Sequence, residues 1–506
     1  MLSRRAFLLS AAAASTALPM LARAQEASRP SAAVDGGTPT VLRLARRTIE
    51  VNGKSASVYG IRQPDGTFGI RTKVGERFRV RVENRIEEVS LIHWHGLTPP
   101  WQQDGVPGIS GPPIPVGGYA DYDFPLRFGG TFWMHSHQGL QEQLLMAAPL
   151  IIHDRRDRAD QQEVIVMLTD FSFTPPEQIF EALKKDSGMA AMPAAAPVPV
   201  SNDMKGMKGM KGMKGMKATG QAGQTMPAGM AMGAAAKPDL NDVKYDAFLA
   251  NDRTLRDPEV VKVEPGGLVL LRVINSSAMS AFHVELGALD GELIAVDGFR
   301  VAPVKARRFP IAVAQRLDIR LAIPRAPAAH PVLAVLEGET NQTGIVLRAG
   351  QAPVARIPDT AAMASPALTL DLESRLRAAH PLKPRKADRV HTINLTGSMA
   401  GYGWSINNVT WSKDVPPLPV AKGERVEMVM VNRTPMPHPM HLHGHEAQVV
   451  EIDGKRFPGA VRDTVLVPPG RRVVFAFDAN NPGLWAFHCH LLYHLEAGMF
   501  TTFRYV

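Results

Sequence analysis

The chain has 506 residues, of which 45% are hydrophobic and 21% are charged, and its formal net charge is +9. This length is typical of two to four domains of roughly 100–200 residues each. Three Arg within residues 1–24 and five Lys within residues 205–217 account for most of the positive charge. The rest of the chain is nearly neutral, so we expect no nucleic-acid partner. No later apolar run approaches the roughly 20 residues of a membrane-spanning helix, so we expect no membrane span.

The N-terminus reads "MLSRRAFLLSAAAASTALPMLARA" and has the features of an export signal. Arg4 and Arg5 precede an Ala-rich apolar run, and Ala22 and Ala24 provide a small-x-small cleavage site. We interpret residues 1–24 as a twin-arginine signal peptide, and a general secretory signal that carries two Arg is the alternative. Either signal predicts export, and the twin-arginine type predicts a periplasmic location.

From about Thr40 the sequence consists of short segments rich in Val, Ile, Leu and aromatic residues, separated by turn clusters such as "QPDGTFG" and "EIDGKRFPG". Three phrases resemble one another: "VGERFRVRVENR", "PGGLVLLRVINSS" and "KGERVEMVMVNRT". Each has a Gly turn, an alternating apolar strand and a closing Asn. This pattern predicts an all-β fold with three copies of a Greek-key β unit, which we place at residues 40–155, 160–355 and 380–506.

Two other segments interrupt the strand pattern. "PPEQIFEALKK", at residues 175–185, predicts a short helix because Pro precedes good helix formers. Residues from about 187 to 237 are rich in Ala, Pro and Met and include "MKGMKGMKGMKGMK", which predicts a disordered insertion. Its thioethers suit Cu(I), so we favour copper capture. A flexible tether in which Met is incidental is the alternative, because the interspersed Lys repel cations.

Histidine spacing is the most informative feature of the sequence. Chance placement of 16 His would give about half of one His-x-His pair, whereas the chain has five. Residues i and i+2 of a strand face the same side, so each pair directs two imidazoles at one point. The eight imidazoles concerned exceed the four ligands of a structural zinc site and predict a cluster of several ions where the first and last units meet. They are His93, His95, His135, His137, His441, His443, His488 and His490. His445 continues the alternation, but the set is complete without it.

Four further ligands lie in the last unit: His438, Cys489, His494 and Met499. Two His, one thiolate and a weak axial Met form a blue-copper electron-transfer site. Cys489 is the only Cys, so it forms no internal disulfide. In "HCH" it faces away from its two neighbours, which predicts a short covalent route between the blue-copper site and the cluster. The remaining His have no partner in sequence, and we expect ordinary hydrogen-bonded roles for them.

The motifs "HWHG", "HSH", "HPMHLHGH" and "HCHLLYHLEAGM" resemble the four copper motifs of three-domain multicopper oxidases. "HSHQGLQEQ" and "WAFHCHLLYHLEAGMF" are most similar to the bacterial periplasmic copper-resistance oxidases and laccases. The resemblance covers essentially the whole mature chain. It implies three cupredoxin-like Greek-key β-sandwich domains and four copper ions, of which one is type 1, one is type 2 and two form a type 3 pair.

The resemblance also assigns roles by motif position. The type 1 ligands would be His438, Cys489, His494 and Met499, and the type 2 ligands would be His93 and His441. The type 3 ligands would be His95, His135, His137, His443, His488 and His490. Asp104, in "WQQDGVPG", matches an acid that helps deliver protons to oxygen, although an ordinary Asp-Gly turn is the alternative. Glu496 is either a second such acid or a surface carboxylate.

The function implied by the resemblance is one-electron oxidation of Cu(I) or a phenolic compound, coupled to reduction of O2 to water, in copper tolerance. A monomer is expected. A general laccase and a non-catalytic copper-sequestering protein are the alternatives. One departure from the family concerns the substrate: no acid precedes His438, and Leu495 follows His494. This argues against the acidic substrate-copper site of the best-known cuprous oxidases, which Met436, Met440 and the Met-rich insertion could replace.

Overall fold

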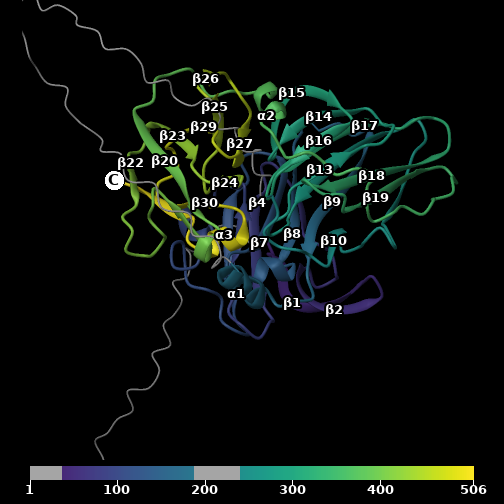
Figure 1. Ribbon diagram of the computed structural model, residues 1–506, viewed down its shortest axis with the longest axis horizontal. Helices are drawn as coiled ribbons and strands as arrows, with labels where there is room; N and C mark the ends of the chain where they lie inside the picture. The colour runs from purple at the N-terminus through teal and green to yellow at the C-terminus, as the bar shows by residue number, and fades with distance from the viewer. Residues whose placement is uncertain (1–36, 156, 187–239) are drawn as a thin grey trace, which may run out of the picture.

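The computed structural model describes residues 37–155, 157–186 and 240–506. The predicted signal peptide and the Met-rich insertion lie outside these residues. The described chain forms three β-sandwiches of two sheets each, which confirms the all-β expectation (Figure 1). In Figure 1 the first sandwich is purple to blue, the second is teal, and the third is green to yellow.

The first sandwich contains one sheet of order β2-β1-β4-β6 and one of order β3-β8-β7-β5. Its strands are β1 (Thr40–Val51), β2 (Lys54–Arg62), β3 (Ile70–Lys73), β4 (Arg77–Asn84), β5 (Ile92–His95), β6 (Tyr119–Pro125), β7 (Gly130–Ser136) and β8 (Ala147–His153). Two short 3-10 helices, η1 (Trp101–Gln103) and η2 (Gln141–Leu144), lie in its loops.

The second sandwich contains sheets of order β10-β9-β12-β17-β14-β15 and β11-β19-β18-β13-β16. Its strands are β9 (Gln161–Phe171), β10 (Ala247–Ala250), β11 (Val260–Val263), β12 (Leu268–Asn275), β13 (Phe282–Glu285), β14 (Gly291–Val296), β15 (Phe299–Ala306), β16 (Arg308–Ile311), β17 (Arg316–Ala322), β18 (Ala328–Leu336) and β19 (Gln342–Ala349). The predicted helix is confirmed as α1 (Pro176–Asp186).

The third sandwich contains sheets of order β21-β20-β23-β29-β25-β26, with β27 beside β25, and β22-β31-β30-β24-β28. Its strands are β20 (Arg389–Ser398), β21 (Gly403–Ile406), β22 (Leu418–Val420), β23 (Arg425–Asn432), β24 (His438–Leu442), β25 (Ala447–Ile452), β26 (Lys455–Arg456), β27 (Val461–Arg462), β28 (Thr464–Val467), β29 (Arg472–Asp478), β30 (Leu484–Cys489) and β31 (Phe500–Tyr505). Helix α3 (Leu492–Glu496) and the 3-10 helix η4 (Ala400–Tyr402) complete it, and helix α2 (Asp371–Arg375) lies in the segment between the second and third sandwiches.

The three sandwiches share one connectivity. Each sheet contains a single parallel pair: β1 with β4, β3 with β8, β9 with β12, β11 with β19, β20 with β23, and β22 with β31. Parallel neighbours cannot be joined by a hairpin, so the chain crosses between sheets in Greek-key fashion. The three similar phrases become β4, β12 and β23, which occupy the same position in each sandwich.

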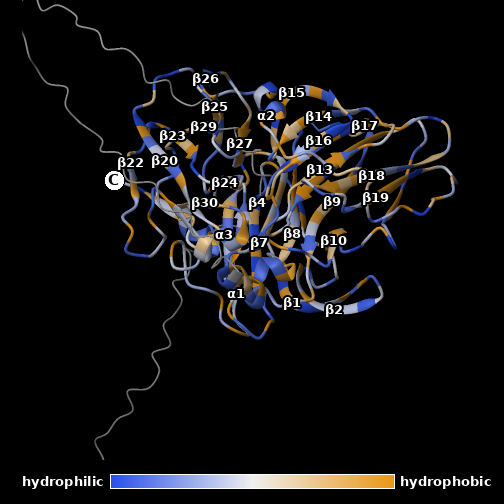
Figure 2. Ribbon diagram, in the orientation of Figure 1, coloured by the Kyte–Doolittle hydropathy of each residue, from blue (hydrophilic) through white to orange (hydrophobic). Residues whose placement is uncertain are grey.

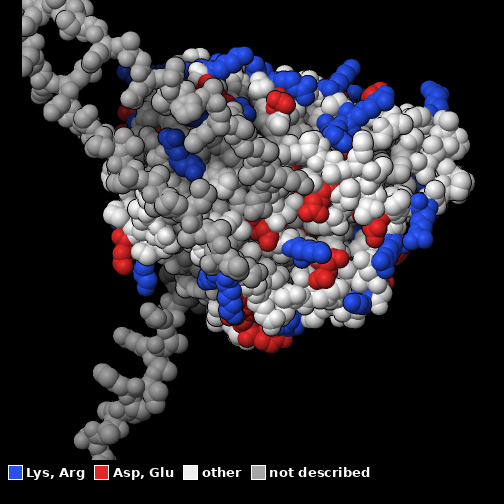
Figure 3. All heavy atoms as spheres, viewed as in Figure 1, with Lys and Arg blue, Asp and Glu red and all other residues white. Residues whose placement is uncertain are grey.

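Strand alternation places the core between the sheets. β4 buries Phe78, Val80 and Val82, and the Arg residues between them face outward. Figure 2 shows the resulting mixture of orange and blue along the strands. Figure 3 shows Lys and Arg with Asp and Glu among them on one face of the molecule, without a single basic stripe on that face. Among the described helices, none combines the length and apolarity needed to cross a membrane.

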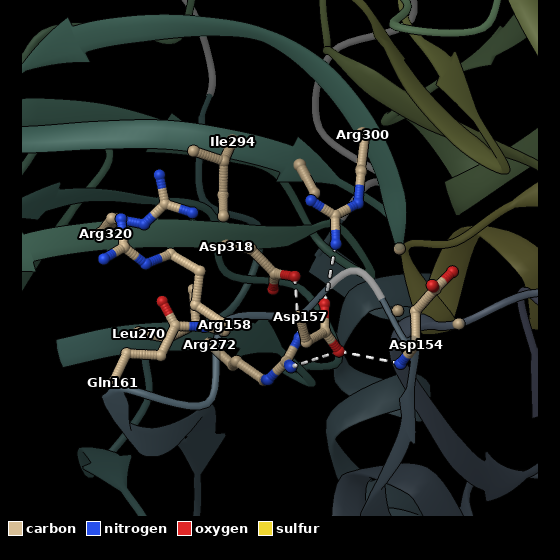
Figure 4. Close-up of a pocket in the computed structure, with 14 residues that line it drawn as sticks. Asp154, Asp157, Arg158, Gln161, Leu270, Arg272, Ile294, Arg300, Asp318 and Arg320 are labelled. Carbon is tan, nitrogen blue, oxygen red and sulfur yellow. Dashed lines mark hydrogen bonds and ion pairs between the residues drawn. The ribbon is translucent and has the colours of Figure 1, made fainter. Parts of the chain in front are cut away.

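A cluster of charged residues joins the first two sandwiches (Figure 4). Arg272, which is almost fully buried, donates to Asp318 at 2.9 Å and to Glu163 at 2.6 Å within the second sandwich, and to the Thr131 hydroxyl of β7 in the first sandwich at 2.9 Å. Arg300 donates at 2.8 Å to Asp157, which lies in the segment between the two sandwiches. These groups surround a cavity of about 30 Å³, which has room for no more than a few waters. Because the acidic and basic side chains pair with one another, we assign this group of ion pairs a structural role at the contact between the two sandwiches.

Candidate metal centres

The eight cluster imidazoles converge where the first and third sandwiches meet. Register within each sandwich places His93 opposite His135 on β5 and β7, and His441 opposite His488 on β24 and β30. Across the junction, His93 Nε2 lies 3.4 Å from His441 Nε2. Seven of the eight imidazoles are buried, and His137 is partly exposed. The structure therefore brings together every residue that the His-x-His pattern selected for the cluster.

The ring nitrogens fall into small groups that could each hold a metal ion. Nε2 of His488 lies 2.9 Å from Nε2 of His443 and 3.3 Å from Nε2 of His137. Nδ1 of His95, Nε2 of His135 and Nε2 of His490 are buried without a hydrogen-bond partner. Leaving such nitrogens unpartnered is costly unless a ligand binds them. These groups therefore fit metal ions.

Asp104 orients imidazoles from both sandwiches. Its backbone carbonyl accepts from His93 Nδ1 at 2.8 Å, and its carboxylate Oδ2 accepts from His443 Nδ1 at 2.8 Å. Both rings therefore present Nε2 to the cluster. Hydrogen bonds of this kind fix the tautomer and ring orientation of metal-binding His.

Two further carboxylates contact the cluster, and the sequence analysis did not identify them. Asp463 Oδ1 accepts from His95 Nε2 at 2.9 Å, and its carbonyl accepts from His441 Nδ1 at 3.0 Å. Glu142 Oε2 lies 2.9 Å from His135 Nδ1. Glu142 lies within the "HSHQGLQEQ" motif, so its position near the His pair could have been predicted from the sequence. Asp463 lies between β27 and β28, 18 residues after His445 and outside any His-x-His motif.

Burial sets the protonation of these groups. It lowers the pKa of the His95, His135, His137, His443, His488 and His490 imidazoles well below the usual value. The neutral imidazole that results is the form that binds metals. Burial raises the pKa of Glu142 well above its usual value. Burial also opposes ionisation of Asp463, but the nearby Arg316 and His95 hold the pKa of Asp463 well below its ordinary value.

A second group surrounds Cys489. Its Sγ lies 3.6 Å from His438 Nδ1 and 3.9 Å from His494 Nδ1. The opposite ring nitrogens are anchored, because His438 Nε2 lies 2.7 Å from Thr434 Oγ1 and His494 Nε2 lies 2.9 Å from Asp242 Oδ2. Both rings therefore turn Nδ1 toward the sulfur. Asp242 belongs to the chain before β10, and the sequence analysis did not identify it.

Met499 is held in the same region by its backbone. Its N–H donates to the His494 carbonyl at 3.0 Å, and its carbonyl accepts from the Cys489 N–H at 3.0 Å. The Met499 side chain is fully buried. Helix α3 carries His494, so the loop from Cys489 to Met499 brings three of the four predicted type 1 ligands together.

Cys489 lies between the two groups. His488 contacts His443 and His137, His490 packs within 5.0 Å of His95 between ring centroids, and Cys489 faces His438. The predicted opposite orientation of Cys489 and its neighbours is therefore observed. Cys489 is joined directly to His488 and to His490 by peptide bonds, so the covalent route from the thiol to either imidazole is short.

His445 does not join the cluster, although strand alternation placed it there. β24 ends at Leu442, and Gly444 has a φ of +66°, so the period of two is lost. His445 instead stacks on Tyr505 and shares a 2.6 Å hydrogen bond with the Tyr505 hydroxyl. It is a core histidine of the third sandwich.

A cavity of about 600 Å³ connects the cluster with exposed residues. Its lining includes His135, His137, His488, His490, Glu142, Trp411, Lys413 and Glu496. Lys413 and Glu496 are exposed, whereas the imidazoles are buried or nearly so. The cavity is large enough for a small molecule such as O2 to reach the ring nitrogens.

Comparison with known protein families agrees with this geometry. Three profiles, each described as multicopper oxidase, match residues 384–506, 44–157 and 162–348. Together they cover most of the chain. The chain belongs to the multicopper oxidase family. Copper is therefore the cofactor, and the protein is a copper-dependent oxidase that uses O2 as its acceptor.

Individual relatives are similar over nearly their full lengths. Multicopper oxidase MmcO of Mycobacterium tuberculosis is 29% identical over 100% of this chain and 97% of its own. The copper resistance protein A homolog of Pseudomonas syringae pv. tomato is 28% identical over 92% of both chains. The solved structure of a laccase from Botrytis aclada has a TM-score of 0.70 at 20% identity, covering 92% of this chain and 88% of that one. The last likeness shows the fold, and it confirms the expected cupredoxin-like sandwiches.

Proposed function

We propose that this oxidase removes single electrons from Cu(I), and also from small phenolic compounds, and that it serves copper tolerance. Four such electrons and four protons convert one O2 to two waters. The observation that carries the proposal is the position of Cys489, which links a His-Cys-His group to an eight-imidazole cluster through single residues. Similarity to proteins named for copper resistance supports the physiological role.

The proposed ligand sets follow the motif positions. Type 1 copper would be held by His438, Cys489, His494 and Met499. Type 2 copper would be held by His93 and His441. The type 3 pair, which completes a three-copper cluster, would be held by His95, His135, His137, His443, His488 and His490. The unpartnered nitrogens of His95, His135 and His490 support this assignment, because the centroids of the three rings lie 5.0 to 5.6 Å from one another.

The protein contributes geometry and a route for electrons. Copper ions, when bound, supply one-electron redox chemistry and the site at which O2 is reduced. Cys489 connects the electron-accepting site to His488 and His490. Asp104 holds His93 and His443 in place, and we assign to it the delivery of protons at its carboxylate. The cavity beside Glu142 would admit O2 and release water.

Electron entry is proposed at His494 through Asp242. No acid precedes His438 in sequence, but Asp242 Oδ2 accepts from His494 Nε2 and also from the Tyr402 hydroxyl at 2.6 Å. This carboxylate belongs to the chain before β10. The Asp242 side chain is buried, so it would place a negative charge beside a type 1 ligand and favour a cationic electron donor through that charge.

Cellular context is also a proposal. We propose export by the twin-arginine signal at residues 1–24 to the periplasm, and action as a monomer. We further propose that the Met-rich insertion captures copper, because thioethers are soft ligands.

The decisive experiment is steady-state O2 consumption with Cu(I) and with a phenol, for the intact protein and for a deletion of residues 201–232. Cu(I) oxidation that is faster than phenol oxidation, and that weakens selectively on deletion, supports the proposal. If phenol is oxidised as fast as Cu(I), the protein is a general laccase. If the deletion leaves Cu(I) oxidation and copper tolerance unchanged, the insertion does not capture copper for this reaction. Copper binding without O2 consumption from a reducing dye would identify a sequestering protein instead.

A further inference from the structure

The second sandwich supplies none of the predicted copper ligands, yet one of its arginines contacts all three sandwiches. Arg316 opens β17 and is fully buried. Its guanidinium donates to the carbonyls of Thr131 at 3.2 Å, Ala314 at 3.0 Å and Asp297 at 3.0 Å. Its two terminal nitrogens also donate to the two carboxylate oxygens of Asp463, with Nη1 at 2.8 Å from Oδ1. These contacts use all five N–H groups of the side chain.

The bidentate pair lies directly behind the cluster. The Asp463 oxygen that receives Arg316 Nη1 also accepts from His95 Nε2 at 2.9 Å. The Asp463 carbonyl accepts from His441 Nδ1 at 3.0 Å. Asp463 therefore contacts one imidazole from the first sandwich and one from the third. Its bond to His95 leaves Nδ1 as the free nitrogen of that ring.

Gly96 makes room for this pair. Its φ is +88°, and a Cβ placed there would lie 2.6 Å from both Arg316 Nη2 and Asp463 Oδ2. Gly96 is the last residue of "HWHG", next to His95. The motif that supplies two cluster imidazoles thus also lets the ion pair approach the backbone behind them.

We propose that Arg316 is a positioning residue for the three-copper cluster: through Asp463 it fixes the tautomer and orientation of His95 and the placement of His441. The proposal rests on the ligand sets of the proposed function. A planar guanidinium fixes both carboxylate oxygens at once, whereas Lys offers a single point charge. Without this bidentate contact from Arg316, the Asp463 carboxylate can rotate away from His95. The second sandwich thereby controls the relative position of the two cluster halves.

The test compares Arg316→Lys with Arg272→Lys. Arg272 is a matched control because it is buried, lies on the neighbouring strand β12, and also pairs with an aspartate and with Thr131. Its hydrogen bonds do not reach the cluster. The readouts are bound copper per chain, the type 2 electron paramagnetic resonance signal and the blue type 1 absorption.

We expect Arg316→Lys to retain the blue absorption and to bind cluster copper about 10- to 100-fold more weakly, which is typical when an outer-shell partner of a ligand is lost. Arg272→Lys should lower thermal stability and leave both signals intact. Full cluster copper with an unchanged type 2 signal in Arg316→Lys would overturn the proposal. Equal loss of cluster copper in Arg272→Lys would also overturn it.

A double-variant comparison covers the case in which Arg316→Lys does not fold. Arg316→Gln combined with Asp463→Asn leaves no unpaired charge buried. If Arg316 acts through Asp463, the double variant binds cluster copper as well as Asp463→Asn alone does. A double variant that binds cluster copper more weakly than Asp463→Asn alone would contradict the proposal. A wild-type chain that binds no copper would refute the proposed function itself, whereas wild-type and Arg316 variants that both bind four ions would refute only the role of Arg316.

Discussion

Cys489 faces His438 and His494, and its sequence neighbours His488 and His490 belong to the imidazole cluster. Burial raises the pKa of its thiol, so a bound metal is needed to stabilise the thiolate. We expect Cys489→Ser to abolish the intense blue absorption and to remove one copper per chain. The cluster should keep its copper, because His488 Nδ1 is held at 2.9 Å by the backbone carbonyl of residue 489, which the substitution retains. Absorption spectra and copper analysis of the purified variant test this, and a surviving blue band would refute the assignment.

Asp104 provides a test of proton delivery. Asp104→Asn keeps the size of the side chain and an acceptor for His443, but it removes the ionisable group. We expect kcat for O2 reduction to fall by about 100-fold, as for loss of a general acid. Anaerobic reduction of the type 1 site should be unchanged. Asp121→Asn, at an exposed carboxylate paired with Arg81, is the control. If the two variants have the same kcat, Asp104 does not deliver protons and only orients His93 and His443.

Glu337 gives a pH prediction away from the copper sites. Burial raises the pKa of this carboxyl from 4.5 to about 7. The folded state therefore holds a proton that the unfolded chain releases above pH 4.5, so stability falls as pH rises from 4.5 through 7. Glu337→Gln keeps an acceptor for the Leu368 N–H. It should stabilise the protein by up to about 3 kcal/mol at pH 8 and by little at pH 5.

Thermal denaturation across this pH range tests the Glu337 prediction. The control is Glu339→Gln, two residues away at an exposed position. A stabilisation by Glu337→Gln that is the same at pH 5 and pH 8 would show that the carboxyl does not titrate as described.

At the scale of elements, the repeated strand ends in an Asn with one repeated role. Asn84, Asn275 and Asn432 are all buried at the ends of β4, β12 and β23. In each, the side-chain oxygen accepts from the N–H two residues later, at 3.1, 3.2 and 2.8 Å respectively. The amide nitrogen donates to two carbonyls in Asn275 and Asn432 and to three in Asn84. The closing Asn thus fixes the loop that follows the strand.

We therefore expect Asn84→Ala to destabilise the protein by about 3 kcal/mol, because buried carbonyls and an N–H lose their partners. Asn275→Ala should have a similar cost. The measurement is the urea midpoint at constant slope. A loss below about 0.5 kcal/mol, the size of an ordinary surface substitution, would contradict this role.

Sequence reasoning succeeded where a local rule applied. Alternation along β5, and along β7, β24 and β30 with the residue that follows each, predicted that the His-x-His imidazoles converge, as the structure shows. The repeated phrases predicted equivalent strands. Sequence reasoning left the role of His445 open, and the turn at Gly444 breaks the alternation that would have placed His445 in the cluster. It also missed Asp242 and Asp463, which reach the centres from segments with no motif. Such contacts depend on how the sandwiches pack, and spacing along the chain carries no information about that.

At the scale of the molecule, the cluster exists only because the first and third sandwiches meet. His93 and His441 are 348 residues apart in sequence and 3.4 Å apart at Nε2. Asp104 spans the junction from the first sandwich to His443, and Asp463 spans it from the third sandwich to His95. The fold therefore holds the two halves of the cluster together through these two carboxylates.

The most direct test of the account is a copper count on the purified chain, combined with absorption and electron paramagnetic resonance spectra. We predict four copper ions per chain, an intense blue absorption from one of them, and one additional type 2 signal. The two type 3 ions should be silent in the resonance spectrum. A chain that stays colourless after copper loading, or that binds a single ion, would contradict the account.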